Sequence, residues 1–205
     1  MKYLEFKNAL KEFPVFSYQD IRKFNPDFQR NRLYEWQLKG LIKKIRKAHY
    51  YFSDQNLNEA FFNFVANRIY RPSYISLESA FSYYNLIPEA VFSFTSVSTK
   101  KTFSLDTIIG NYEYQNIKPS LFFGYRLVKM KEFNIKIAEP EKAILDYIYL
   151  RKPNDITTFE MLRLNLEVLS TLITLSKLDA YLKVYSSNVM NKRVQLFKKY
   201  INAES

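Results

Sequence analysis

The chain has 205 residues, of which 47% are apolar and 18% aromatic, and its formal net charge is +11. This length allows one large domain or two small ones, and the apolar content is ample for a packed core, which excludes a disordered chain. Because cysteine is absent, disulfides and thiolate metal sites are excluded. A single histidine, His49, also excludes a Cys-His dyad and a multi-histidine metal site.

Other features argue against a membrane protein and against most enzymes. No apolar run approaches the roughly 20 residues needed to span a bilayer, and residues 1–11 carry charges throughout, unlike a signal peptide. We therefore expect a cytoplasmic protein without a membrane partner. The three glycines, Gly40, Gly110 and Gly124, are too far apart for a phosphate-binding loop. We expect no catalytic residues, no cofactor, no metal and no small-molecule substrate.

The N-terminal segment has the pattern of a winged helix-turn-helix, beginning with a short capped helix. Ser17 can accept a backbone N–H bond as the N-cap, and Asp20 supplies the negative charge favoured in a first turn. Phe16 and Ile21 fall at the two positions of a hydrophobic staple. The helix is predicted to end before Pro26, because the residue preceding proline is pushed out of the α region.

A second, longer helix is predicted over residues 27–39, ending at Gly40, which most easily adopts the left-handed conformation. Residues 41–47 and 48–52 are then predicted to form a β-ribbon, the wing. Three apolar residues are predicted to form the core of this motif: Leu33, Trp36 and Leu41.

Positive charge concentrates on the predicted second helix and ribbon. Residues 21–50 contain nine Lys or Arg and two acids, and nine minus two leaves seven of the total of +11. A winged helix meets phosphates there, with its second helix in the major groove, although a merely solvated face is the competing interpretation. Base contacts are expected near the start of that helix, from Gln29, Arg30 and Arg32. The other predicted DNA-binding residues are Lys39, Lys43, Lys44, Arg46 and Lys47. His49 could in principle be the base of a serine triad, but its place in the ribbon favours a surface or DNA-facing role.

The rest of the chain predicts an α+β protein: the winged helix is followed by a mixed α/β domain with a largely antiparallel sheet and a helical C-terminal end. A connecting helix over residues 57–69 and a break at 71–73 place the boundary, giving predicted domains 1–56 and 57–205. The later predicted elements are a helix over 76–84 capped by Ser76, strands over 91–97, 102–105 and 112–117, a hairpin of 125–130 and 133–138 around residues 131–132, and helices over 140–150, 158–169, 171–185 and 187–201.

Three later segments resemble the AbiEi family of antitoxins and predicted transcriptional regulators of viral defence. They are residues 76–89, SLESAFSYYNLIPE; residues 95–101, TSVSTKK; and residues 138–146, AEPEKAILD. They stand in the order of the family, after a winged helix, and the resemblance covers about residues 1–150. The chain departs from the family at Asn85, where glycine is usual, and at Phe103, where a basic residue is frequent.

The resemblance implies two roles in an abortive-infection toxin-antitoxin system used in phage defence. The N-terminal domain would bind double-stranded DNA at inverted repeats in its own promoter, and so act as a repressor of the operon. The C-terminal domain would counter a nucleotidyltransferase-type toxin, and direct binding of the two proteins is not implied. The resemblance marks these candidate antitoxin residues: Ser76, Glu78, Ser79, Thr99, Lys100, Lys101, Glu141, Lys142 and Asp146.

The motif residues also have structural interpretations. Ser76 and Glu78 fit a helix cap and a first-turn acid. Residues 95–101, rich in hydroxyls and ending in two lysines, could hold a phosphate or RNA, or could be a strand edge with protective lysines. Such a phosphate site keeps an RNA-binding or protein-interaction module open as an alternative function.

Three carboxylates keep one enzymatic alternative open. Glu139, Glu141 and Asp146 could serve a metal-dependent nuclease or nucleotidyltransferase. However, Glu141 and Asp146 are five residues apart on one predicted helix and do not share a face. Attraction to the positive helix terminus accounts for the two glutamates, and a buried hydrogen-bond partner would account for Asp146.

Overall fold

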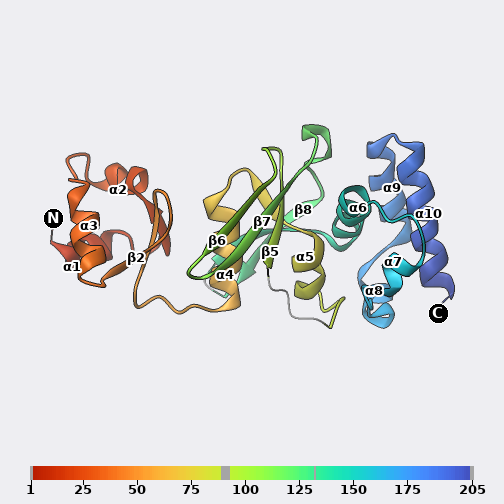
Figure 1. Cartoon of the computed structure of the whole chain (residues 1–205), viewed down its shortest axis with the longest axis horizontal. Coiled ribbons are helices and arrows are strands. Elements are labelled where there is room, and N and C mark those ends of the chain that lie inside the picture. The colour runs from red at the N-terminus through yellow and green to blue at the C-terminus, as the bar shows by residue number, and fades with distance from the viewer. Residues whose placement is uncertain (1, 89–92, 132, 204–205) are drawn as a thin grey trace.

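The computed structural model describes residues 2–88, 93–131 and 133–203. The protein is an α+β molecule, as predicted, and it is elongated. Figure 1 shows a small N-terminal unit at one end, a sheet in the middle and the C-terminal helices at the other end. Among the described residues, no helix is both long enough and apolar enough to cross a membrane.

The N-terminal unit, residues 2–56, is a three-stranded antiparallel sheet with three helices. Its elements are α1 (Tyr3–Ala9), β1 (Val15–Ser17), α2 (Tyr18–Phe24), α3 (Asn31–Leu38), β2 (Ile42–Arg46) and β3 (His49–Phe52), and the strand order is β1-β3-β2. The predicted cap of α2 is confirmed: the Ser17 hydroxyl accepts from the Asp20 amide, and the Asp20 carboxylate accepts from the Ser17 amide at 2.9 Å. Helix α1 and strand β1 were not predicted.

The predicted second helix begins later than expected. Residues 27–30 are not helical, and α3 starts at Asn31. The physical reason is Phe28, which is 5% exposed in the core and whose carbonyl accepts a hydrogen bond from the Tyr18 hydroxyl at 3.2 Å. The predicted end is confirmed, because Gly40 has a φ of +67°.

An aromatic cluster forms the core of the N-terminal unit. The Phe6 ring lies 4.4 Å from the Trp36 ring and 5.3 Å from the Phe16 ring, centroid to centroid. Of the predicted core residues, Leu33 and Trp36 are buried, and Leu41 is partly buried against the same cluster. Burying one such side chain stabilises a fold by about 1.5–3 kcal/mol, so the burial of Phe6 accounts for the packing of α1 against this core.

The C-terminal unit, residues 57–203, is built on a sheet that, within the described residues, has six strands. They are β4 (Ser73–Ile75), β5 (Ser93–Ser98), β6 (Phe103–Thr107), β7 (Gly110–Asn116), β8 (Tyr125–Met130) and β9 (Phe133–Ala138), in the order β6-β7-β5-β4-β9-β8. The sheet is more mixed than predicted, because β5 and β7 are parallel, and so are β4 and β9.

Most predicted strands are confirmed within a few residues, but β4 was missed. The start of the predicted strand over 91–97, residue 89 of the first motif and residue 132 of the predicted hairpin turn lie outside the described residues.

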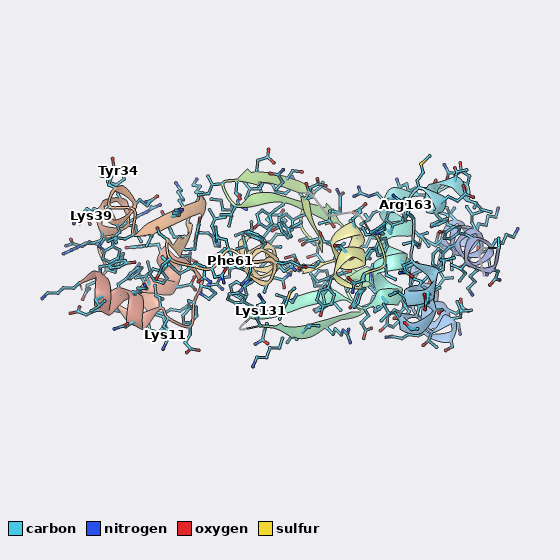
Figure 2. All side chains as sticks on the ribbon, turned by 90° about the horizontal axis from the view of Figure 1, so that it is seen from below. Lys11, Tyr34, Lys39, Phe61, Lys131 and Arg163 are labelled. Atoms are coloured by element: carbon cyan, nitrogen blue, oxygen red, sulfur yellow. The ribbon has the colours of Figure 1, made fainter. Side chains whose placement is uncertain are left out.

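Helices cover both faces of this sheet. Helix α4 (Glu59–Ile69) packs on β4, β5 and β9, and Figure 2 shows α4, which carries Phe61, between the two sides of the curved sheet. The other face carries α5 (Leu77–Tyr83) and α6 (Pro140–Arg151), and α6 in turn contacts α9 (Leu175–Tyr185) and α10 (Asn188–Ala203). The remaining helices are the 3-10 turn η1 (Pro119–Leu121), α7 (Thr157–Glu160) and α8 (Leu166–Leu172).

Residues in the left-handed region end one of the predicted helices and interrupt another. After α5, Asn85 takes a φ of +56°, so it serves the left-handed turn for which glycine is usual in the family. The single helix predicted over 158–169 is wrong: the chain forms α7 and then α8, because Arg163 takes a φ of +50°. The side chain of Asn165 then caps α8 by accepting from the Val168 amide at 3.1 Å.

Candidate nucleic-acid interface

Helix α3 is two-sided, and its outward side faces away from the rest of the molecule. Its buried residues Leu33 and Trp36 point into the N-terminal core. Figure 2 shows Tyr34 and Lys39 projecting outward at the end of the molecule opposite the C-terminal helices. The exposed residues of the helix are Asn31, Arg32, Tyr34, Glu35 and Leu38.

The predicted base-contacting residues gather at the start of α3. Gln29, Arg30 and Arg32 are all exposed, although only Arg32 lies on the helix itself. Gln29 and Arg32 line a shallow cavity of about 270 Å³, together with residues of the preceding turn. The Arg30 guanidinium lies 5.9 Å from the centre of the Tyr18 ring, which orients it at the edge of the helix.

The β2–β3 hairpin, which is the predicted wing, carries three exposed lysines. In the β2–β3 hairpin, Ile42 and Ile45 point inward, while Lys43 and Lys44 lie exposed between them. The pairing register shifts after Lys44, an irregularity that bends a strand and re-aims its side chains. Lys47 is exposed in the hairpin turn.

Arg46 differs from the other predicted DNA-binding residues. It is partly buried, its guanidinium donates to the Ile69 carbonyl at 3.3 Å, and it lies 4.9 Å from the centre of the Phe103 ring. Arg46 therefore connects the β2–β3 hairpin to α4 and β6, unlike the exposed lysines of the hairpin. Phe103, one of the departures from the family pattern, supplies the aromatic face for this contact.

A second contact also joins the two units. Arg68 of α4 forms an ion pair with Asp20, the acid of the α2 capping box. Burial alone would raise the pKa of Asp20, but the hydrogen bond from Ser17 and the charge of Arg68 hold it below its usual value. Asp20 therefore stays ionised near neutral pH and connects the start of α2 to α4.

His49 begins β3 and is only partly exposed. Burial lowers its pKa, and the nearby charges of Arg46 and Arg68 lower it further, outweighing the Lys47 carbonyl and Asp20. The imidazole is thus neutral at pH 7. Its Nδ1 is buried without a hydrogen-bond partner among the described residues, so His49 is part of the packing at the foot of the wing.

Several motif residues of the C-terminal unit form a buried network centred on Asp146. One carboxylate oxygen, Oδ2, accepts from the Tyr74 hydroxyl at 2.9 Å and from the Ser76 hydroxyl at 2.8 Å. The other oxygen pairs with the Lys142 ammonium, which also donates to the Tyr185 hydroxyl at 3.1 Å. Asp146 and Lys142 are both 0% exposed. The predicted buried hydrogen-bonding role of Asp146 is confirmed.

Aromatic rings enclose the Lys142 ammonium. Its nitrogen lies 5.2 Å from the centre of the Phe123 ring and 5.6 Å from those of Tyr74 and Tyr185. Gly124, at a φ of +67°, passes so close that a Cβ there would lie 3.0 Å from Lys142 Cγ. Burial lowers the pKa of Lys142, and the Asp146 carboxylate opposes that shift. In this arrangement, neither the Lys142 nor the Asp146 side chain is accessible to another molecule.

The predicted capping role of Ser76 is corrected. Ser76 occupies the N-cap position of α5, but its hydroxyl donates to Asp146 and makes no capping bond. The Thr95 hydroxyl of β5 accepts from the Ser79 amide at 3.0 Å instead, and it donates to the Ser76 carbonyl at 2.8 Å. The Ser79 hydroxyl in turn accepts a hydrogen bond from the Thr95 amide at 2.7 Å.

The three candidate carboxylates are not one cluster. Glu139 and Glu141 share Lys177, whose nitrogen lies 3.2 Å and 3.3 Å from them, whereas Asp146 belongs to the buried network. Burial alone would raise the pKa of Glu139, but the Tyr181 hydroxyl and Lys177 lower it. In the part of the chain that the structure describes, no group of three or more His, Asp or Glu residues could hold a metal ion.

Of the nine candidate antitoxin residues, four have exposed or partly exposed side chains: Glu78, Thr99, Lys100 and Lys101. Glu78 accepts two hydrogen bonds from Arg151, at 2.9 Å and 3.0 Å. Lys100 lies 5.5 Å from the centre of the Tyr70 ring. Among the candidate antitoxin residues, Lys100 and Lys101 at the end of the second motif are therefore the most open to solvent.

Compared with known proteins, the chain matches no protein-family model and has no significant match among curated sequences. Functional assignment therefore rests on the arrangement of the chain's own residues and on the motifs described above.

Proposed function

We propose that the protein is a DNA-binding autorepressor and antitoxin of the AbiEi type. In this proposal the N-terminal unit is a winged helix-turn-helix, with α2 and α3 as its two helices and the β2–β3 hairpin as its wing. The observation that carries the proposal is an exposed group of cations around the outward side of α3: Arg30, Arg32, Lys39, Lys43, Lys44 and Lys47.

The element order supports this assignment. Helix α3 has one buried side and one free side, as a helix that enters the major groove needs. The free cations lie at both ends of that helix and on the adjoining hairpin, where phosphates would flank it. The promoter of the protein's own operon is the proposed duplex, which implies action in the cytoplasm.

The antitoxin role rests on the three motifs and on which of their residues can be reached. The buried network holds β4, α5, α6 and α9 together. Thr99, Lys100 and Lys101 are left to act on the toxin pathway. The functional partner is a nucleotidyltransferase-type toxin, and the proposal includes neither an enzymatic activity nor a stable complex with the toxin.

Salt dependence of DNA binding tests the proposal. Each phosphate contact contributes about −0.9 to the slope of log K against log salt. The variant Lys43→Ala/Lys44→Ala/Lys47→Ala should therefore have a slope that is shallower by about 2.7, with little change in sequence preference. The measurement is fluorescence anisotropy with a promoter duplex between about 50 and 200 mM salt.

A matched control removes the same charge elsewhere. Lys183→Ala/Lys192→Ala/Lys199→Ala changes exposed lysines of α9 and α10 and should keep the slope of the unmodified protein. If the two triple variants had equal slopes, the wing would not be part of the DNA interface. Absence of DNA binding by the unmodified protein would contradict the proposal.

A further inference from the structure

The outward side of α3 carries two large apolar side chains that the protein leaves in water. Tyr34 is 65% exposed and Leu38 is 71% exposed. They are four residues apart and so lie on one side of the helix, away from the buried Leu33 and Trp36. A surface helix normally presents polar residues on that side. We therefore expect another molecule to cover this apolar pair.

The charge around the pair identifies the occupant. Arg30 and Arg32 lie at the start of α3, Lys39 at its end, and the wing lysines lie on the adjoining hairpin. Within α3 the only acidic residue is Glu35. A second copy of this surface would bring cations against cations, whereas a nucleic acid duplex supplies the opposite charge on both sides of an apolar strip.

We infer that Tyr34 and Leu38 contact thymine methyl groups in the major groove. This inference rests on the proposed function and adds the base that the protein selects. The C5-methyl of thymine is the apolar group on the major-groove edges of the bases, and apolar side chains are its usual partners.

The spacing of the two side chains sets the spacing of the two bases. Four residues of α-helix rise about 6 Å, close to two steps of about 3.4 Å along one DNA strand. Each half-site therefore contains two thymines about two base pairs apart. Glu35, which lies between Tyr34 and Leu38, and Asn31, which lies three residues before Tyr34, are exposed on the same side. They supply the neighbouring polar contacts, since Asn pairs with adenine and Glu accepts from cytosine.

Uracil substitution tests this inference directly. Duplexes are first selected from a random library with the full-length protein, and each thymine of the selected duplex is then replaced in turn by uracil, which lacks only the methyl group. Because burying one methyl-sized group is worth about 0.8 kcal/mol, each contacted position should lose affinity by about fourfold. Two such positions, about two base pairs apart, are expected per half-site.

Variants of the two residues assign the positions. Leu38→Ala should bind the thymine and uracil duplexes equally at one of these positions, and Tyr34→Ala should do so at the other. Both side chains are exposed, so melting temperatures should stay unchanged. Leu127→Ala, which changes a residue of β8 that is 69% exposed, is the control and should keep the full discrimination.

The outcomes separate this inference from the proposed function. If no duplex is enriched, the proposed function fails. If duplexes are enriched but uracil costs nothing, or if both variants keep the discrimination, the thymine contacts are overturned. Sedimentation velocity covers the remaining case: a dimer that Tyr34→Ala or Leu38→Ala converts to monomer, with unchanged discrimination, would make this side a self-association surface and overturn the inference.

Discussion

Lys142 is the residue whose environment differs most from the environment that its side chain prefers. A lysine ammonium without exposed surface loses its hydration, and here the Asp146 carboxylate, the Tyr185 hydroxyl and the rings of Phe123, Tyr74 and Tyr185 replace the water. Such a pair is costly to break, because removal of one member leaves the other buried and charged. Lys142 and Asp146 of the third motif therefore serve the packing of α6 within the C-terminal unit.

Lys142→Met should therefore lower the free energy of unfolding by about 3–5 kcal/mol, the usual cost of breaking a buried pair. Lys142→Met/Asp146→Asn should recover part of that loss, because it removes both charges while an amide can still bond with Tyr74 and Ser76. Chemical denaturation measures both. A loss under about 1 kcal/mol for the single variant would mean that the pair does not stabilise the fold.

The exposed lysines of the second motif, Lys100 and Lys101, are expected to affect function and not stability, in contrast to Lys142. Lys100→Ala/Lys101→Ala should leave stability within about 0.5 kcal/mol while weakening protection of cells that express the toxin. Lys142→Met should lose protection only in proportion to its unfolded fraction. Full protection by the Lys100→Ala/Lys101→Ala variant would exclude these lysines from the proposed antitoxin role.

Among the elements, β3 is the one on which the N-terminal unit depends most, because it pairs with both β1 and β2. His49 begins this strand, and its folded-state pKa lies below the ordinary value of 6.5. The unfolded chain therefore binds a proton more readily than the folded one. This contribution to stability is present above pH 6.5 and is lost as the pH falls below 6.5 towards the folded-state pKa.

The unit should consequently lose stability between about pH 7 and pH 5, before its carboxylates titrate. His49 is the only histidine, so its NMR titration can be assigned without ambiguity, and denaturation at several pH values gives the stability. His49→Gln, which cannot titrate, should remove the dependence in this range. An imidazole pKa at or above 6.5, or the same dependence in the variant, would contradict this account.

Element prediction from the sequence succeeded where the signal is local. The Ser17 cap of α2, the end of α3 at Gly40 and the start of α6 at residue 140 are each decided within a few residues, and each appears where expected. It failed where the deciding partner is distant. The start of α3 depends on the burial of Phe28, and the cap of α5 comes from Thr95 on β5.

The same distinction applies to the candidate sites. The cations around α3 were predicted from sequence, since charge is visible in composition. Two features were not: the engagement of Arg46 with Ile69 and Phe103, and the burial of Lys142. No periodicity signals a contact between residues more than 20 positions apart. The outward position of Tyr34 was ambiguous because apolar residues occur on several sides of α3.

At the scale of the whole molecule, the two units share a core. Val15, Ile45 and Tyr51 of the N-terminal unit belong to the same buried cluster as α4, and the rings of Tyr51 and Phe61 are 5.6 Å apart. The Arg68–Asp20 and Arg46–Ile69 contacts lie along the same junction. The boundary predicted after residue 56 remains a prediction, but this junction makes the two sides energetically dependent.

The full chain should therefore unfold in one cooperative transition, and a fragment of residues 57–205 should fold with a lower melting temperature. Its own cluster spans the sheet and α6, which is sufficient for folding, but removal of residues 1–56 exposes the side of α4 that Val15 and Tyr51 cover. Circular dichroism during heating compares the two proteins, and binding of an apolar dye reports the exposed surface. Two separate transitions in the full chain, the later one coinciding with that of the fragment, would show that the junction contributes no stability. In that case the proposed DNA binding at α3 could not influence the C-terminal unit through this junction.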